Sequence, residues 1–256
     1  MTGALWAEWT KLRTVATTGW LLIGTVVLTV GVSAAAAAAT HVTSGQGQDP
    51  TKLSLIGIYL GQTVLAVLAV LTISEEYGTG MIRSTLAAIP SRIVLLGAKA
   101  ANVAGLALVA GVLAVTGCLL VGRLWLPAAG LNPAHGYAFV SIDQGPTLRA
   151  ALGSILYLVL ISLFALGVAT AVRDTAVSIG AVLGLLYLPP ILAQAVTDPL
   201  RHHVLQIAPM TAGLAIQDTT DLGSQPLAPW TGLGVLAAWA VGSLLVGGLL
   251  LRLRDA

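Results

Sequence analysis

The chain contains few charged residues for its length. Of its 256 residues, 9% are Asp, Glu, Lys or Arg, whereas a soluble globular domain carries about 25%. Hydrophobic residues make up 57%, and the mean hydropathy is +0.92. Too little polar sequence is available to cover the surface of a soluble domain of this length. The composition therefore predicts a protein whose main solvent is the lipid bilayer.

The sequence also lacks the residue patterns of several function classes. A single cysteine, Cys118, excludes a disulfide framework and a thiolate metal site. The basic residues are scattered singly, although the net charge is +2, which argues against nucleic-acid binding. No H-E-x-x-H pair occurs, and Ser162 and Ser178 have no candidate base in nearby sequence. A membrane-embedded enzyme is therefore kept only as an alternative, without nameable catalytic residues or a metal site.

Long apolar runs are the main feature that the sequence does have. A helical span needs about 20 apolar residues, and helices satisfy their backbone groups internally in lipid. The runs predict an all-α polytopic membrane protein with six transmembrane helices, at about 20–40, 54–74, 97–122, 149–172, 175–196 and 231–251. The expected external loops are 41–53, 123–148 and 197–230, the last with a short or re-entrant helix at 211–216, and residues 252–256 form a tail.

The distribution of Lys and Arg predicts the orientation. One side of the predicted topology carries Lys11, Arg13, Arg83, Arg92, Lys99, Arg173, Arg252 and Arg254, and the other carries Lys52, Arg123, Arg149 and Arg201. Cytoplasmic loops are richer in basic residues. We therefore expect both termini in the cytoplasm, for a multi-pass protein of a bacterial plasma membrane.

Residues 1–19 are expected to form an amphipathic elbow helix on the inner membrane surface. Leu5, Trp9 and Leu12 recur at helical spacing, with Lys11 on the opposite side. Basic residues before an apolar run also resemble a secretory signal, but the run from residue 20 exceeds the usual 7–15 residues. The helix is either a simple anchor or a contact for a cytoplasmic partner. Its expected interfacial residues are Trp6, Trp9, Lys11 and Arg13.

The most distinctive segment, 75–92, follows the second predicted span. It reads E-E-Y-G-T-G-M-I-R-S-T-L-A-A-I-P-S-R. Two acidic residues end the apolar run, the glycines permit a turn, and Thr79 is expected to cap a short helix that stops at Pro90. Ile82 and Leu86 fall on one face of that helix. The candidate contact residues are Glu75, Glu76, Tyr77, Gly78, Thr79, Ile82, Arg83, Leu86, Pro90 and Arg92.

This segment resembles the coupling region of type-2 ATP-binding-cassette (ABC) exporter permeases. The acid, the glycine, Arg83, Leu86, Pro90 and Arg92 stand in the family's order, and the Trp9-x-Lys-Leu-Arg start and the run 209–213 are similar too. One departure is Gly80, which has low helix propensity and delays the expected helix. The resemblance implies a permease that exports an amphipathic drug, antibiotic, peptide or lipid-like substrate.

The resemblance also implies the partners. They are two ABC ATPase subunits and a second permease copy or paralogue, in contact with membrane lipid and without nucleic acid. ATP and Mg²⁺ would be bound by the ATPases, and no cofactor by this chain, which lacks a G-x-x-x-x-G-K-[ST] phosphate loop. Glu75, Glu76, Arg83 and Arg92 are then expected to contact the ATPase or act as hinges. Alternatively, they only end helices and bind lipid headgroups.

A secondary transporter driven by an ion gradient is the remaining alternative. Such proteins need ionisable groups or broken helices inside the bilayer. The cores of the predicted spans are free of charge and so supply no ionisable groups of this kind. Pro189 and Pro190 interrupt the fifth span and are a candidate gating kink, although a proline kink is usually structural.

Overall fold

The chain folds as a bundle of long helices. The computed structural model describes residues 2–40, 48–88, 91–132, 137, 140–141, 143–220, 222–224 and 226–253, and these residues form helices without strands. Six helices are long and apolar enough to cross a membrane: α2 (Ala16–Ala39), α4 (Ile58–Gly78), α6 (Arg92–Trp125), α7 (Gly145–Val172), α8 (Thr175–Leu192) and α11 (Pro229–Leu253). The predicted all-α fold with six spanning helices is confirmed, and it indicates a multi-pass membrane protein.

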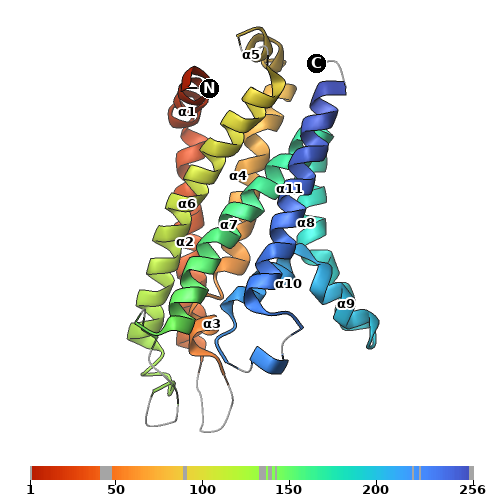
Figure 1. Ribbon diagram of the computed structural model, residues 1–256. Coiled ribbons are helices and arrows are strands. Elements are labelled where there is room, and N and C mark those ends of the chain that lie inside the picture. The colour runs from red at the N-terminus through yellow and green to blue at the C-terminus, as the bar shows by residue number, and fades with distance from the viewer. Residues whose placement is uncertain are drawn as a thin grey trace.

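Helix α7 forms the centre of the bundle. It packs against α4, α6, α8 and α11, and its Tyr157 and Phe164 side chains are fully buried. About half of the apolar window is buried in α4, α6 and α7, whereas only 22% is buried in α2, α8 and α11. The outer helices thus present apolar side chains where lipid would lie. Both chain termini lie at the same end of the bundle (Figure 1).

Glycines let α7 and α11 cross closely. A Cβ at Gly247 of α11 would lie 2.6 Å from the carbonyl oxygen of Gly167, and one at Gly167 would lie 2.4 Å from Ser243 Oγ. Real Cβ atoms do not approach neighbours so closely, so both positions need glycine. Small residues at helix crossings are the common packing device in membranes because they permit backbone contact.

Short helices lie at both ends of the bundle. The end with the termini carries α1 (Thr2–Thr14) and α5 (Ile82–Ala88), and the opposite end carries α3 (Pro50–Ser54), α9 (Leu200–Ile207) and α10 (Pro209–Leu214) (Figure 1). The described residues also form the 3-10 turns η2 (Ala193–Ala195), η3 (Ala215–Gln217) and η4 (Leu222–Ser224). The expected short helix at 211–216 corresponds to α10 and η3, which pack against α11.

The observed bounds differ from the predicted ones at several helices. Helix α6 begins at Arg92 and ends at Trp125, well beyond the predicted 97–122, and α7 begins at Gly145 instead of 149. The predicted loop 41–53 contains α3, whose first amides are capped by the Asp49 carboxylate. Residues 41–47 lie outside the described part of the chain. Apolar periodicity marks the lipid-facing core of a helix but not the turns that extend it into water.

The two prolines of α8 lie close to its end. Pro189 and Pro190 are inside the helix, which ends at Leu192 and continues as η2. A proline lacks the amide that would bind the carbonyl one turn earlier, so the helix weakens there. The predicted gating role of the pair stays a prediction.

Candidate functional site

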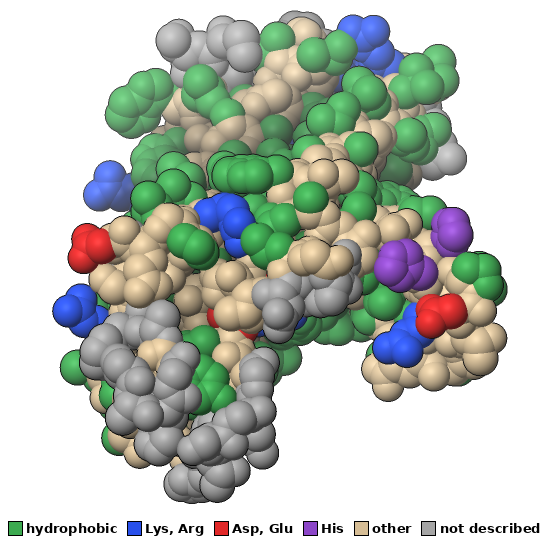
Figure 2. Space-filling model, turned by 60° about the horizontal axis from the view of Figure 1, so that its bottom comes forward, with side chains coloured by type: hydrophobic (Ala, Val, Ile, Leu, Met, Phe, Trp, Pro, Cys, Tyr) green, Lys and Arg blue, Asp and Glu red, His purple; other side chains and the backbone are tan. Residues whose placement is uncertain are grey.

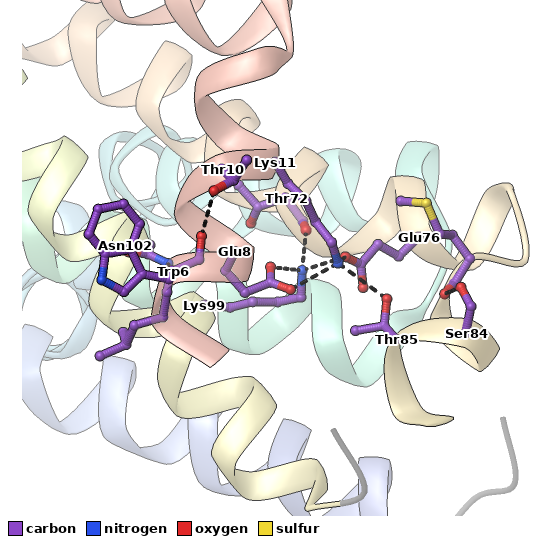
Figure 3. Close-up of polar contacts among 12 residues, drawn as sticks. Trp6, Glu8, Thr10, Lys11, Thr72, Glu76, Ser84, Thr85, Lys99 and Asn102 are labelled. Carbon is purple, nitrogen blue, oxygen red and sulfur yellow. Dashed lines mark hydrogen bonds and ion pairs between the residues drawn. The ribbon is translucent and has the colours of Figure 1, made fainter. Parts of the chain in front are cut away.

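A buried ionic cluster lies at the end of the bundle that bears the termini. We define the ionic cluster as Glu8, Lys11, Glu76 and Lys99 (Figure 3). Lys99 Nζ lies 2.7 Å from Glu8 Oε2 and 2.9 Å from Glu76 Oε1. Lys11 Nζ lies 2.9 Å from Glu8 Oε1 and 2.8 Å from Glu76 Oε1. Each carboxylate therefore bridges two ammonium groups, and the formal charges of the cluster sum to zero.

The ionic cluster joins three helices, and a hydrogen bond links it to a fourth. Glu8 and Lys11 come from α1, Glu76 from the last turn of α4, and Lys99 from α6, about two turns after its first residue. Lys11 also donates a hydrogen bond of 3.2 Å to Thr85 Oγ1 on α5, and Lys99 donates one of 2.9 Å to the Thr72 carbonyl. The elbow helix α1 and the short helix α5 are thereby tied to two spanning helices.

Three of the four side chains of the ionic cluster are shielded from solvent. Glu8 and Lys99 are each 3% exposed and Glu76 is 4% exposed, whereas the Lys11 side chain is 35% exposed. Buried charges carry a large desolvation cost that only close pairing offsets. The cluster satisfies this condition because four contacts of 2.9 Å or less link its members, two of them to different oxygens of Glu8.

The length of α6 exceeds the thickness of the hydrocarbon core of a bilayer. Its 34 residues span about 51 Å at 1.5 Å per residue, against a hydrocarbon thickness of about 30 Å. About 20 Å of the helix therefore extends beyond the hydrocarbon in total. Lys99 lies about 10 Å along the helix from Arg92. The cluster is thus near the end of α6 at which the short helices α1 and α5 meet the spanning helices.

The pairing overrides the effect of burial on the two groups of α1. Burial raises the pKa of the Glu8 carboxyl, but the Lys99 charge and hydrogen bonds from Lys99 and Lys11 outweigh it, so the pKa is lowered from its ordinary 4.5. Burial lowers the pKa of Lys11, but its hydrogen bonds to Glu76 and Glu8 outweigh it, and the pKa is raised from 10.5. Both groups are therefore held in their charged forms at neutral pH.

One carboxylate oxygen of the cluster has no hydrogen-bond partner among the described residues. This oxygen is Glu76 Oε2, which is buried. A small cavity of about 80 Å³, lined by α1, α2, α4 and α6 residues, adjoins the cluster. That volume accommodates water, which normally satisfies such groups. Among the described residues, no three His, Cys, Asp or Glu side chains gather as a metal site requires.

Only part of the predicted segment 75–92 belongs to the cluster. Glu76 does, whereas Glu75 is exposed. Tyr77 lies under the Arg173 guanidinium, 5.1 Å from the ring centroid. Ile82 of α5 is buried.

The predicted capping role of Thr79 is wrong. Thr79 Oγ1 and the Thr79 amide both donate to the Glu75 carbonyl, at 2.7 and 3.0 Å, so Thr79 closes α4 instead of opening α5. Gly78 ends α4, and Gly80 adopts a positive φ of 72°, which glycine permits without strain. Helix α5 then begins at Ile82, later than a Thr79 cap requires.

Three predicted contact residues have no described side chain. Arg83 and Leu86 belong to α5, but their side chains lie outside what the structure describes, and Pro90 lies wholly outside it. Their predicted roles stay predictions.

Arg92 caps another helix instead of standing free for a partner. Its guanidinium donates to the carbonyls of Leu251 and Arg252 at the end of α11. Arg173, at the end of α7, donates to the Leu250 carbonyl over 3.2 Å. Cations are favourable at a helix C-terminus because its last carbonyls carry partial negative charge. Arg92 thus joins α6 to α11 at the same end as the ionic cluster.

The predicted face of α1 is partly wrong. Trp6 is 70% exposed, Trp9 is 40% exposed and Arg13 is exposed too, which suits interfacial side chains. Lys11, however, turns inward to the ionic cluster and does not lie on the outer side. The spacing pattern missed this because Glu8 provides a buried partner that apolar periodicity does not register.

Glu8 and Lys99 are the functional candidates that sequence reasoning missed. Lys99 was counted as a charge at the end of a span, yet it lies within α6 and is almost fully buried. The expectation that spans contain no charge is therefore wrong at Lys99. A signal existed, since Lys99 is a single charge in a long apolar run, and such residues usually face a partner inside the bundle.

Polar contacts also tie the bundle together near its opposite end. Lys52 of α3 pairs with Asp218 at 2.5 Å. Asp49 Oδ2 accepts the amides of Thr219 and Thr220, at 2.6 and 3.2 Å. Figure 2, turned to bring this end forward, shows charged side chains spread over this face, with two histidines near one acidic and one basic side chain at one edge. The described residues of this end thus hold one ion pair, Lys52–Asp218, in contrast to the four ion pairs of the ionic cluster.

A hydrogen-bonded network lies within the spans. Gln62 of α4 accepts from the Tyr157 hydroxyl of α7 and donates to the Tyr187 hydroxyl of α8 over 3.1 Å. Tyr187 in turn donates to the Tyr59 carbonyl and lies 2.6 Å from Thr63 Oγ1. The network attaches α8, which has few buried residues, to the centre of the bundle.

Comparisons with known proteins add no relative. No known protein-family model matches the chain, and no curated protein matches it.

Proposed function

We propose that the chain is the permease subunit of an ATP-driven ABC exporter in a bacterial plasma membrane, with both termini in the cytoplasm. A separate pair of ATPase subunits supplies the energy, and a second permease copy or paralogue completes the transporter. The substrate is an amphipathic drug, antibiotic, peptide or lipid-like molecule. The six spanning helices and the motif at 75–92 support the proposal.

The ionic cluster is the observation that carries this proposal. Helix α5 is short and lies at an end of the bundle, where an ATPase would dock. Thr85 of α5 contacts Lys11 of α1, and Lys11 contacts the carboxylates of Glu8 and Glu76. Both carboxylates also contact Lys99 of α6. A displacement of α5 would therefore act on α1, α4 and α6 together, because a buried ion pair resists separation.

An ion-gradient-driven transporter is the second candidate, and one observation favours it. Glu76 is a buried carboxylate with an unpartnered oxygen next to a small cavity. Proton-driven transporters use buried carboxylates of this kind. Against it, Glu76 Oε1 contacts the ammonium groups of both Lys11 and Lys99, so this carboxylate is part of an ionic cluster whose formal charges already sum to zero.

The deciding experiment purifies the tagged chain from its native membrane. The proposal predicts a stoichiometric ATPase in the complex, and ATP-dependent export of a fluorescent amphipathic probe after reconstitution. Arg83→Glu on α5 should lower ATPase recovery severalfold, whereas the control Arg201→Glu on α9, at the opposite end, should not. Transport by the chain alone, driven by a proton gradient and unaffected by ATP, would establish the second candidate instead.

A further inference from the structure

An apolar groove runs between α6 and α11 at the end of the bundle that bears the termini. It has a volume of about 430 Å³. Its lining includes Ile93, Gly97 and Ala100 of α6 and Leu245, Gly248 and Arg252 of α11. Ile93 and Leu245 are 48% and 68% exposed, so the groove opens to the outside of the bundle, where lipid would lie.

Glycines keep the groove open. No atom lies within 4 Å of a Cβ built at Gly97, and a Cβ at Gly248 would meet only the Leu96 side chain, at 3.3 Å. The two helices are neighbours here, but no large side chain fills the space between them. The space is therefore available to a slender apolar ligand.

The groove has the length of one leaflet. From Ile93 to Ala100, α6 advances about 11 Å at 1.5 Å per residue. Half the hydrocarbon thickness is about 15 Å. An acyl chain from the leaflet on the side of the termini would fit along it, whereas a ligand that crosses the membrane would not.

A positive charge stands at the surface end of the groove. Arg252 is in the last turn of α11 and pairs with no acidic side chain among the described residues. The last carbonyls of α11 are already bound by Arg92, so the Arg252 guanidinium is not needed to cap its own helix. Basic pockets between spanning helices bind anionic lipid headgroups.

We propose that this groove binds one anionic phospholipid, with an acyl chain between α6 and α11 and its phosphate at Arg252. A second apolar groove, between α7, α8 and α11, provides a contrast. It is lined by Phe164, Trp239 and Ser243 and has no charged side chain. It can accept an acyl chain but has no charged side chain with which to select a headgroup, whereas the α6–α11 groove has Arg252.

The test measures lipid selectivity of the reconstituted chain. Spin-labelled phosphatidylglycerol and phosphatidylcholine report the motionally restricted lipids in phosphatidylcholine vesicles. One arginine near the surface favours the anionic lipid about fivefold. Arg252→Gln should abolish that preference, whereas Arg123→Gln, in the last turn of α6 at the opposite end, should retain it.

A second pair of variants tests the groove itself. Gly97→Leu fills the open space and should release the bound phosphatidylglycerol that native mass spectrometry detects on the wild-type chain. Gly105→Leu is the control, because Gly105 also has no neighbour within 4 Å but lies outside the groove. Equal lipid retention by the two glycine variants, or equal selectivity of the two arginine variants, would overturn the proposal. A fall in oligomeric mass of Gly97→Leu with unchanged lipid would also overturn it, by showing that a second copy of the chain covers the groove.

Discussion

Lys99→Met removes the ammonium that contacts Glu8 and Glu76 while keeping an unbranched apolar side chain of similar length. The two carboxylates then remain buried with only the Lys11 ammonium between them. Removing one partner of a buried ion pair costs about 3–5 kcal/mol, because the remaining charge stays desolvated. For a chain of this size that corresponds to a fall in Tm of roughly 10 °C.

A double variant separates pairing from packing. Glu8→Gln with Lys99→Met removes one charge of each sign, so the cluster stays neutral. We expect the double variant to be more stable than the sum of the single losses predicts, by at least about 1 kcal/mol, since neighbours in one network are not additive. Glu8→Gln alone leaves Lys99 with only Glu76 as a charged partner, and it should be destabilised as well.

The assay is thermal unfolding of the detergent-solubilised chain, followed by loss of the monodisperse peak in size-exclusion chromatography. Lys52→Met is the control, because Lys52 also pairs with a buried carboxylate, that of Asp218, but it has one such partner where Lys99 has two, and its own side chain is 43% exposed. Water partly replaces the lost contact at Lys52, so its Tm should fall less than that of Lys99→Met. Equal Tm values for the Lys99 and Lys52 variants, together with additive losses in the double variant, would refute the reasoning about the ionic cluster.

Three further outcomes are expected. Because folding lowers the pKa of Glu8, the ionised Glu8 carboxylate stabilises the folded state fully above pH 4.5, and this stabilisation is lost as the pH falls below 4.5. The Tm of the wild type should therefore drop below pH 4.5, and the Tm of Glu8→Gln should drop less. Gly247→Leu should prevent folding of the α7–α11 crossing, whereas Gly180→Leu, with no neighbour within 4 Å, should fold; a chromatographic profile of both variants checks this. Tyr187→Phe should lower stability by about 1–2 kcal/mol, as thermal unfolding would show, because it leaves buried partners in α4 unsatisfied; an unchanged Tm would mean that α8 is held by packing alone.

The spanning helices were predictable because one physical rule dominates them. A long apolar run such as that of α2 has no stable conformation in lipid except a helix. The ends of the helices were predicted less accurately than their centres. The additional turns of α6 lie beyond charged residues, Lys99 at one end and Arg123 at the other, so a search for charge-free apolar runs does not include them.

Local sequence signals of helix ends could be interpreted only in part. Asp49 followed by Pro50 is a regular start of a helix, with a capping carboxylate and a proline at the first position, and α3 begins there. Thr79 shows the opposite case. Its hydroxyl can accept an amide of a following helix or donate to the carbonyl four residues earlier, and sequence alone does not choose between them. The Glu75 carbonyl is its partner.

The ionic cluster was not predictable from local patterns. Glu8 and Lys99 are separated by 91 positions, and each resembles an ordinary charge near a helix end. Only the packing of α1 on α6 makes them partners. Their burial is a tertiary property, and no window of sequence contains both residues.

That separation has a consequence for biosynthesis. Glu8 emerges from the ribosome with the first helix, and its partner Lys99 follows only when the third spanning helix is made. During this interval the Glu8 carboxylate has no Lys99 to neutralise it and is expected to stay at the water-exposed surface, holding α1 away from the hydrocarbon. Arrival of α6 then allows α1 to dock. Docking of the elbow helix α1 would therefore depend on the correct insertion of the first three spanning helices.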